Sequence, residues 1–210
     1  MTNKHGMLIA LEGIDGSGKS LLAKNLYEHF KQERNVLLTK EPGGSTLGKE
    51  LRNILQQHTS PIDAKAEFLL FAADRAQHFT EVIIPHLQKN FMIISDRMAD
   101  SSIVYQGYGR GLDKQLLKTI NTWAMQDVTP DLTLYVHIDA ATATQRFTNR
   151  NTQLSRFEQE NTQFFEKLIN GYNQLYQDKK NVIIIDGTKT PEDVTAQAKD
   201  SILQWIKNHN

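Results

Sequence analysis

The sequence predicts an α/β fold in which a five-stranded parallel sheet lies between two layers of helices. Two observations predict it: five short apolar runs have the length of buried strands, and segments with helical periodicity separate them. Strands that alternate with helices usually pair in parallel, because each crossover helix returns the chain to the same edge of the sheet. Ligands bind such domains beyond the carboxyl ends of the strands, so we expect the functional residues there.

The predicted strands and helices alternate along the whole chain. Helical spacing of apolar residues appears in segments 21–30 and 47–55, and a longer helical stretch over 64–87 has Pro85 near its end. Further helical segments lie between and after the last two strands. Residues 142–155 are dense in Thr, Asn, Gln and Arg, so we expect a polar, mobile loop there. The strand-like runs are residues 7–11, 36–39, 91–94, 132–138 and 182–185.

Length and composition favour one globular domain over residues 1–210. A chain of 210 residues with 39% hydrophobic and 23% charged residues can bury one substantial core, but it is too short for two ordinary enzyme domains. No apolar run approaches the roughly 20 residues of a membrane span. Residues 1–6 are short and polar, unlike a secretory signal. We therefore expect a cytoplasmic protein without a membrane partner.

Charge and cysteine content exclude several classes of function. The 24 basic and 24 acidic residues give a net charge of zero, so the chain lacks the overall positive field that binds nucleic acid. Because the chain has no cysteine, disulfides, thiolate zinc sites and cysteine nucleophiles are excluded. The seven histidines have no ligand-type spacing, and we expect no zinc site.

A phosphate-binding motif follows the first predicted strand. Residues 13–20 read Gly-Ile-Asp-Gly-Ser-Gly-Lys-Ser and match G-x-x-x-x-G-K-[ST] between a strand and a helix. The glycines let backbone N–H groups point at the β-phosphate, and the helix N-terminus adds partial positive charge. Lys19 would bridge the β- and γ-phosphates, and Ser20 would offer an oxygen to Mg²⁺. A glycine-rich turn before an ordinary helix is the alternative. The predicted ATP-binding residues are Gly13, Asp15, Gly16, Ser17, Gly18, Lys19, Ser20 and Leu21.

Charged side chains follow two other strands at the same predicted edge of the sheet. Asp96 and Arg97 come directly after the third strand, where an acid can hold Mg²⁺ and an arginine can hold a phosphate. A structural salt bridge between them is the alternative. Phe71 and Arg75 are four residues apart and therefore share one helix face, from which they could stack on a base and bond its edge. A core phenylalanine beside a surface arginine is the alternative for this pair.

The combined set of motifs resembles bacterial thymidylate kinases. The resemblance extends from the first strand to about Asp186 and implies the P-loop kinase fold, with a lid segment at about residues 142–156. It also implies transfer of the γ-phosphoryl group of ATP to dTMP, giving dTDP for dTTP biosynthesis, with Mg²⁺ as cofactor. A homodimer formed through helices on one side of the sheet is implied as well. The strings that carry it are residues 12–20, 41–44, 71–75, 96–97, 101–102, 105–107 and 156–158.

The resemblance implies a role for each acceptor-site residue. The phenylalanine matching Phe71 stacks on thymine, and the arginine matching Arg75 bonds the thymine edge. The arginine matching Arg97 holds the acceptor phosphate, the acid matching Asp15 orients the acceptor end, and the tyrosine matching Tyr105 fills the space of a ribose 2′-hydroxyl. The predicted acceptor-site residues are Asp15, Glu41, Pro42, Phe71, Arg75, Arg97, Ser101, Ser102, Tyr105 and Gln106.

Phosphoryl transfer also needs positive charge on the γ-phosphate and exclusion of water. One subgroup of the family has an arginine in the phosphate loop, where this chain has Gly16, so the charge must come from the lid. A solvated basic face on a surface helix is the alternative. The predicted catalytic residues are Asp15, Lys19, Arg97, Arg146, Arg150 and Arg156, and the predicted metal ligands are Ser20 and Asp96.

Two departures from the family pattern lie close to the predicted site. Met98 stands where an aromatic residue is common, and Lys40 stands where an arginine is common. Lysine lacks the planar fork of arginine, so two-point phosphate binding at position 40 is in doubt. Another nucleotide or nucleoside kinase and a catalytically inactive remnant are the related alternatives. A GTP-dependent switch is the alternative from another class, but the chain has no Asn-Lys-x-Asp string that would read guanine.

Overall fold

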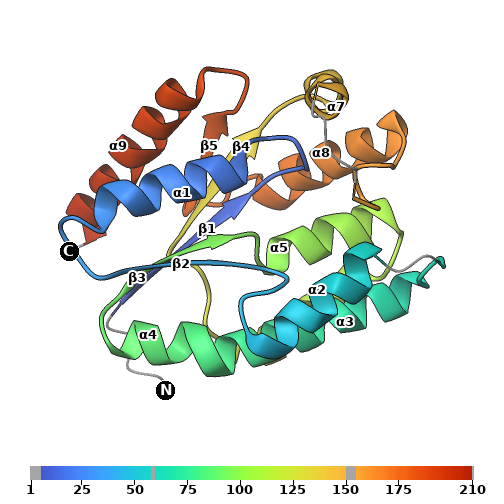
Figure 1. Ribbon diagram of the computed structural model, residues 1–210, viewed down its shortest axis with the longest axis horizontal. Coiled ribbons are helices and arrows are strands. Elements are labelled where there is room, and N and C mark those ends of the chain that lie inside the picture. The colour runs from blue at the N-terminus through green and yellow to red at the C-terminus, as the bar shows by residue number, and fades with distance from the viewer. Residues whose placement is uncertain (1–5, 58–59, 150–154, 210) are drawn as a thin grey trace.

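In the computed structural model, which describes residues 6–57, 60–149 and 155–209, the predicted parallel sheet is present. The strands lie in the order β2-β3-β1-β4-β5, and every neighbouring pair is parallel. Figure 1 shows helices on both sides of this sheet, which confirms the predicted three-layer α/β fold. The strands are β1 (Met7–Glu12), β2 (Val36–Lys40), β3 (Met92–Asp96), β4 (Leu132–His137) and β5 (Val182–Asp186).

The first half of the chain supplies the phosphate-loop helix and the helices that cover one face of the sheet. The three segments from residue 64 to residue 88 follow one another without a break, as the sequence predicts, and Pro85 begins the last of them. The elements are α1 (Lys19–Phe30), α2 (Thr46–Gln57), α3 (Ala64–His78), the π-helix η1 (Phe79–Ile83) and α4 (Ile84–Gln88).

The second half of the chain adds the remaining helices. Two consecutive segments form one helical run after β3 and carry the residues of the Ser101 to Gly107 string. The elements are α5 (Ala99–Ser102), the π-helix η2 (Ile103–Gly109), α6 (Lys114–Ala124), α7 (Ala140–Thr148), α8 (Thr162–Tyr176) and α9 (Pro191–His209).

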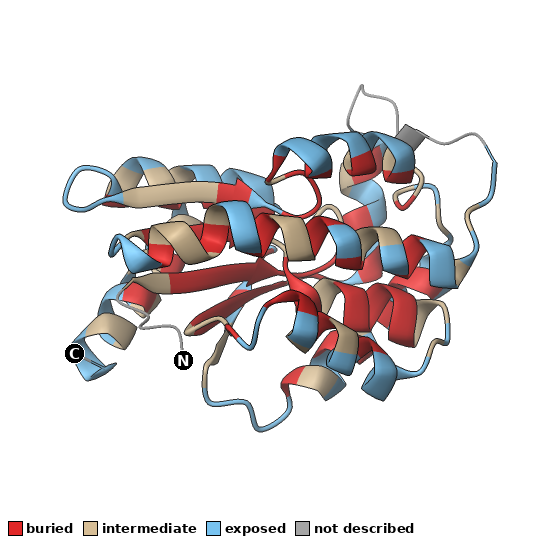
Figure 2. Cartoon of the chain, turned by 90° about the horizontal axis from the view of Figure 1, so that it is seen from below, coloured by how far each residue is buried: buried red, intermediate tan, exposed pale blue. Residues whose placement is uncertain are grey.

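Alternating side chains of β1 divide the core between the two faces of the sheet. Ile9 and Leu11 pack with α1 and α9, whereas Leu8 and Ala10 pack with η1 and α4. Both sets are buried, as expected for a central parallel strand covered on both faces. Figure 2 shows the strands buried between helices whose outer surfaces are exposed. The core therefore fixes the direction and depth of the strand that leads into the phosphate loop.

The strand register brings the predicted functional ends together. Leu11 of β1 and Lys40 of β2 both lie opposite Asp96 of β3, and Glu12 lies opposite Tyr135 of β4. The turns after β1, β2 and β3 therefore leave the sheet at the same level. The phosphate loop, the Glu41–Pro42 turn and the Asp96–Arg97 pair share this edge, as the sequence predicts.

The polar segment predicted as a mobile loop is partly helical, so that prediction is wrong for residues 142–148. Helix α7 covers them because Asp139 accepts a hydrogen bond from the Thr142 backbone N–H at 2.7 Å and caps the helix. Ala140, Ala143 and Phe147 form a buried stripe on the inner face of α7. The polar residues between them are the exposed face of an amphipathic helix. Within the described ranges, no helix is long and apolar enough to cross a membrane.

Candidate active site

The phosphate loop joins β1 to α1 through backbone conformations that favour glycine. Gly16 and Gly18 have φ angles of 80° and 91°, in the left-handed region that side chains disfavour. A Cβ atom on Gly16 would also lie 3.0 Å from the Phe147 ring of α7. Gly18 occupies the position before the first residue of α1, so the free N–H groups of that helix face the loop. The loop thus has the geometry that the motif predicts.

Lys19 lies beneath this loop. Its Nζ atom donates to the Ile14 carbonyl oxygen at 2.7 Å and to Ser17 Oγ at 3.1 Å, and the side chain is 5% exposed. Burial, together with the nearby Arg97 guanidinium, lowers the pKa of Lys19 to about 8. A cation held this close to the loop can follow the phosphates of a bound triphosphate with little rearrangement.

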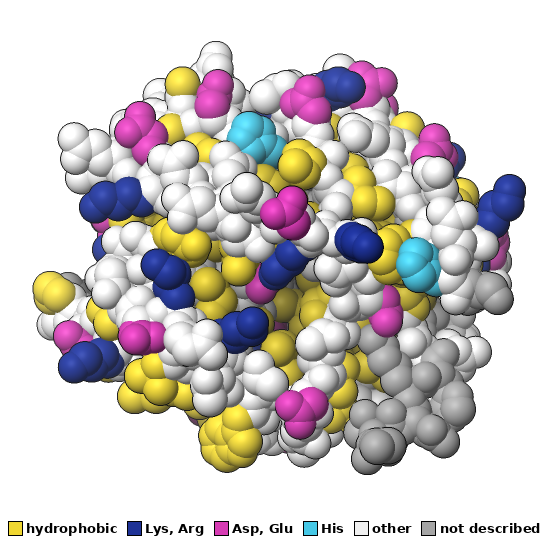
Figure 3. Space-filling model, turned by 180° about the vertical axis from the view of Figure 1, so that it is seen from behind, with side chains coloured by type: hydrophobic (Ala, Val, Ile, Leu, Met, Phe, Trp, Pro, Cys, Tyr) yellow, Lys and Arg dark blue, Asp and Glu magenta, His cyan; other side chains and the backbone are white. Residues whose placement is uncertain are grey.

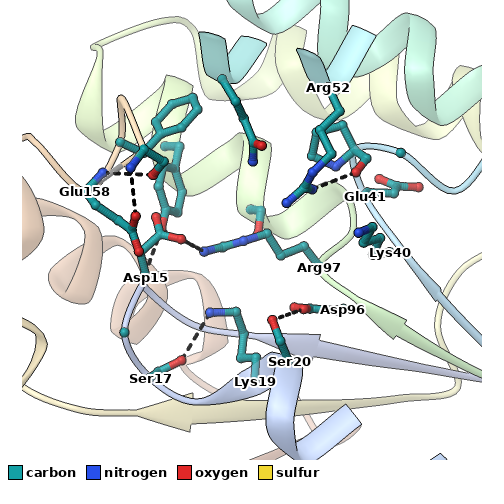
Figure 4. A pocket seen from close by; sticks show the side chains of 18 of the residues that line it. Asp15, Ser17, Lys19, Ser20, Lys40, Glu41, Arg52, Asp96, Arg97 and Glu158 are labelled. Carbon is teal, nitrogen blue, oxygen red and sulfur yellow. Dashed lines mark hydrogen bonds and ion pairs between the residues drawn. The ribbon is translucent and has the colours of Figure 1, made fainter. Parts of the chain in front are cut away.

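Ser20 and Asp96 meet across the sheet edge. Ser20 Oγ donates to Asp96 Oδ2 at 2.5 Å, and Figure 4 shows both side chains beside Lys19 at the foot of the cleft. These hard oxygen donors suit Mg²⁺, which usually takes one or two protein ligands and completes its shell with phosphates and water. In the part of the chain that the structure describes, no three His, Cys, Asp or Glu side chains gather to form a metal site of their own.

Arg97, Asp15 and Tyr105 form a hydrogen-bonded triad above the loop. Arg97 Nη2 donates to Asp15 Oδ1 at 2.7 Å and to the Tyr105 hydroxyl at 3.1 Å. The Tyr105 hydroxyl donates to Asp15 Oδ2 at 2.8 Å. Arg97 therefore pairs with Asp15 rather than with its neighbour Asp96, and the alternative of a local Asp96–Arg97 salt bridge is not what the structure shows.

The charges of this triad stabilise each other. Burial alone would raise the pKa of Asp15, but the Arg97 and Lys19 cations outweigh burial and hold that pKa below its usual value. Burial would also lower the pKa of Arg97, and Asp15 outweighs it, so the guanidinium pKa stays well above its ordinary value. The site therefore presents a fixed positive group and a fixed carboxylate side by side.

Arg75 lies at the centre of a buried polar cluster. Its guanidinium donates to Glu41 at 2.8 Å, to the Asn121 side-chain oxygen at 2.6 Å and to Ser102 Oγ at 3.2 Å. The side chain is only 1% exposed, so the alternative of a surface arginine is wrong. Phe71, one turn earlier, lies 6.1 Å from the Phe157 ring and lines the same cleft. The pair shares one face, as its spacing predicts.

Two of the three predicted lid arginines lie in described residues, and each already has protein partners. Arg146 donates to the carbonyl oxygens of Gly16 at 2.9 Å and Gly187 at 2.7 Å, so it rests against the phosphate loop. Arg156 is hydrogen-bonded to buried Glu67 of α3, on the acceptor side of the cleft. Arg150 lies outside the described residues.

One large cleft unites these groups. Its volume is about 2100 Å³, roughly twice that of the larger ordinary small-molecule pockets. All the site residues predicted from the sequence line it, apart from Gly13 and apart from Arg150, whose surroundings are not described. Figure 4 shows the phosphate loop at one end and Glu41 and Arg52 at the other. Such a space can hold two nucleotides at once.

Sequence reasoning missed several residues that shape the cleft. Arg52 of α2 donates to the Pro42 carbonyl oxygen at 2.8 Å and points into the cleft. A basic residue on the polar side of an amphipathic helix is common, so no pattern marked it. Glu67 and Asn121 are buried beneath the acceptor end, at 0% and 2% exposure. Only the helix spacing of Glu67, four residues before Phe71, could have placed it on the same face.

A phosphate loop and a strand-end acid that share one cleft with several arginines define a nucleotide kinase of the P-loop class. Comparisons with known proteins narrow this class. The family model described as thymidylate kinase matches residues 11–198. The chain belongs to the thymidylate kinase family.

Individual relatives support the assignment over nearly the full length. The chain is 42% identical to a thymidylate kinase of Halothermothrix orenii, over 90% of this chain and 92% of the relative. It is 41% identical to that of Thermosipho africanus, over 96% of this chain and 100% of the relative. The solved thymidylate kinase structure from Ehrlichia chaffeensis superposes with a TM-score of 0.79 at 29% identity, and the match covers 94% of this chain and 98% of that one.

Proposed function

We propose that this chain transfers the γ-phosphoryl group of ATP to dTMP, giving dTDP and ADP, as a step toward dTTP. One observation carries the proposal: the phosphate loop lines the same cleft as a second group of side chains, Phe71, Arg75 and Arg97, which can bind a base and a phosphate. The fold and the membership of the thymidylate kinase family support the same reaction.

The donor end would bind ATP through the phosphate loop. Backbone N–H groups of the loop and of the α1 N-terminus would face the phosphates, and Lys19 would move from its loop partners to the β- and γ-phosphates. Ser20 and Asp96 would hold Mg²⁺, since their oxygens already lie together. When bound, the ion would supply positive charge to the phosphate oxygens.

The acceptor end would bind dTMP between the Arg97 triad and the Arg75 cluster. Phe71 would stack on thymine, and Arg75 would present its guanidinium to the base edge while Glu41 fixes its orientation. Arg97 would hold the acceptor phosphate and remain paired with Asp15. Arg52 points into the same space and can supply the planar guanidinium that Lys40 lacks.

The chemistry we propose is direct in-line transfer without a covalent enzyme intermediate. The acceptor oxygen belongs to a phosphate that is already ionised at neutral pH, so little general-base catalysis is needed. Positioning and charge neutralisation then account for the rate. Arg146, Arg150 and Arg156 are the proposed lid cations, and Arg146 and Arg156 would leave their present protein partners to reach the transferred group.

The test is ADP release, measured by a coupled assay, with dTMP against the other nucleoside monophosphates. We expect dTMP to be the preferred acceptor. Lys19→Ala should reduce turnover at least tenfold, whereas Lys24→Ala, on the exposed face of the same helix, should leave it unchanged. Strong turnover by the Lys19 variant, or preference for another acceptor, would contradict the proposal.

We also propose that the chain acts as a cytoplasmic homodimer. Exposed apolar side chains lie on α3 and on α2 and α6, which both pack against α3. They are Leu47, Ile54, Leu69, Leu116 and Trp123, with exposed fractions from 44% to 78%. Figure 3 shows basic and acidic side chains interspersed on the face opposite to that of Figure 1. The net charge of zero gives no overall single-sign field that would oppose self-association. Sedimentation equilibrium of the wild type and of Trp123→Glu would test this, because a dimer formed through α6 should become a monomer in the variant.

A further inference from the structure

We propose that Glu12 is a positioning residue for the acceptor phosphate, because it holds the turn from which the Arg97 side chain would reach that phosphate. Glu12 would not touch either substrate. The inference rests on the proposed function, since it concerns the arginine assigned to the dTMP phosphate, and it assigns a role to a residue that ends β1 just before the phosphate loop.

The Glu12 carboxylate is buried and accepts four hydrogen bonds. Oε1 accepts from the backbone N–H of Met98 at 2.9 Å and from that of Ser101 at 3.3 Å. Oε2 accepts from Ser101 Oγ at 2.6 Å and from the Tyr172 hydroxyl at 2.9 Å. The side chain is 0% exposed. An amide could accept at only one of these two positions, so the site disfavours glutamine. Burial and nearby Asp100 raise the pKa of Glu12 to about 7.

The turn that Glu12 holds is strained at Arg97. Arg97 has a φ of 70°, in the left-handed region, which a non-glycine residue keeps only when tertiary contacts hold it there. Its N–H donates to the Leu11 carbonyl oxygen at 2.9 Å, and its own carbonyl accepts from Ser95 Oγ at 2.8 Å. Glu12 binds the next N–H, that of Met98. The backbone is therefore held before, at and after the strained residue.

The same carboxylate also sets the direction of the Arg97 side chain through Ser101. A serine hydroxyl has one proton, and Ser101 donates it to Glu12. Its lone pairs are then left to accept from Arg97 Nη1, which lies 3.1 Å away. Arg97 Nη1 also donates to the Gly13 carbonyl oxygen at 2.9 Å. Glu12 thus fixes one edge of the guanidinium, and Asp15 fixes the other.

The experiment is a double-mutant cycle between Glu12→Gln and Arg97→Ala, read by steady-state kinetics with dTMP and ATP. Glu12→Gln should lower kcat/KM for dTMP roughly tenfold while KM for ATP changes less than about twofold. In the Arg97→Ala background the Glu12 change should have no further effect on kcat/KM for dTMP, because the residue it positions is gone. Independent, multiplying effects in the double variant would overturn the proposal.

Two variants separate positioning from mere packing. Tyr172→Phe removes one donor from the same carboxylate and a contact with Ser101 Oγ at 3.2 Å. It leaves the Met98 and Ser101 bonds to Glu12 and the bond from Arg97 to Ser101 in place, so it should lower the melting temperature but leave KM for dTMP within about twofold. Ser101→Ala keeps the Glu12 carboxylate and removes its bridge to Arg97. It should lower kcat/KM for dTMP about as much as Glu12→Gln does, and it takes the place of Glu12→Gln if that variant proves unstable. A dTMP defect as large in Tyr172→Phe as in Ser101→Ala would refute the assignment.

The cycle is also measured by thermal unfolding, which does not depend on turnover. If the wild type does not phosphorylate dTMP, the proposed function fails, but the melting-temperature shifts of the two single variants still decide whether Glu12 and Arg97 act as a unit. Shifts that fall short of additive support the coupling. Shifts that add show two separate side chains and overturn it.

Discussion

Tyr105 should determine whether the acceptor sugar can carry a 2′-hydroxyl, and the structure gives the size of each perturbation. Its hydroxyl donates to Asp15 Oδ2 and accepts from the Asp15 N–H and from Arg97, and the side chain is 6% exposed. A hydrogen bond to a charged group contributes about 1.5–3 kcal/mol. Because Arg97 still holds Asp15 in Tyr105→Phe, we expect a stability loss near the lower end of that range.

Tyr105→Ala also removes a ring that packs edge-on against Phe157 and Phe164, with ring centroids 5.9 and 6.3 Å apart. Removing a buried aromatic ring costs about 3–5 kcal/mol, a large share of the roughly 5–15 kcal/mol that stabilises a domain. Circular dichroism must therefore show that this variant is folded before its kinetics are compared.

The assay for Tyr105 is the ratio of kcat/KM for dTMP to that for its ribo analogue. A small group that a pocket cannot accommodate changes this ratio about 10- to 200-fold. The wild type and Tyr105→Phe should prefer the deoxy acceptor to that extent, because both keep the ring. Folded Tyr105→Ala should lose most of the preference, since the space is open. If the folded alanine variant keeps the wild-type ratio, the ring does not select the sugar.

Three further predictions concern single side chains. Arg97→Ala should raise KM for dTMP and lower kcat, with a total loss of about 1.5–3 kcal/mol in kcat/KM; an effect confined to ATP would contradict its role. Arg156→Ala, which removes one of the partners of Glu67, should lower kcat more than ATP affinity, and equal losses would indicate a ground-state contact. Burial and Glu41 raise the pKa of Asp74 to about 6, so its contribution to unfolding free energy falls as pH rises from about 4 to 6. In urea titrations the unfolding free energy of Asp74→Asn should lack this fall with pH. Between pH 4 and pH 7.5 the variant should therefore gain up to about 3 kcal/mol of unfolding free energy relative to the wild type. An unchanged pH dependence would show that Asp74 is already ionised below pH 4.

The sequence was sufficient for the strands and for the edge at which the site forms. Buried strands of a parallel sheet read as continuous apolar runs, and both β1 and β3 end where such a run gives way to polar residues. The phosphate loop could be predicted equally well, because backbone geometry and charge require its glycines and Lys19 within a short stretch of chain. These features are local.

The sequence was insufficient for α7 and for the state of the arginines. Polar composition alone suggested a loop at residues 142–148, whereas a buried stripe of three residues and the Asp139 cap make it a helix. The spacing of Arg75 by itself favoured a surface arginine, and only the approach of Glu41 and Asn121 from other elements shows why it can be buried. A side chain's partners from distant segments leave no local pattern.

The sequence by itself therefore determined the sheet, the phosphate loop and the set of strand-end residues, because periodicity and short motifs depend on neighbours in the chain. Tertiary structure decided how those residues pair. Asp15 and Arg97 are 82 positions apart, and Tyr172 reaches Glu12 across 160 positions. The strength and direction of a charged group depend on burial and on the few ångströms to its partners. Those distances exist only once the strands and helices have packed together.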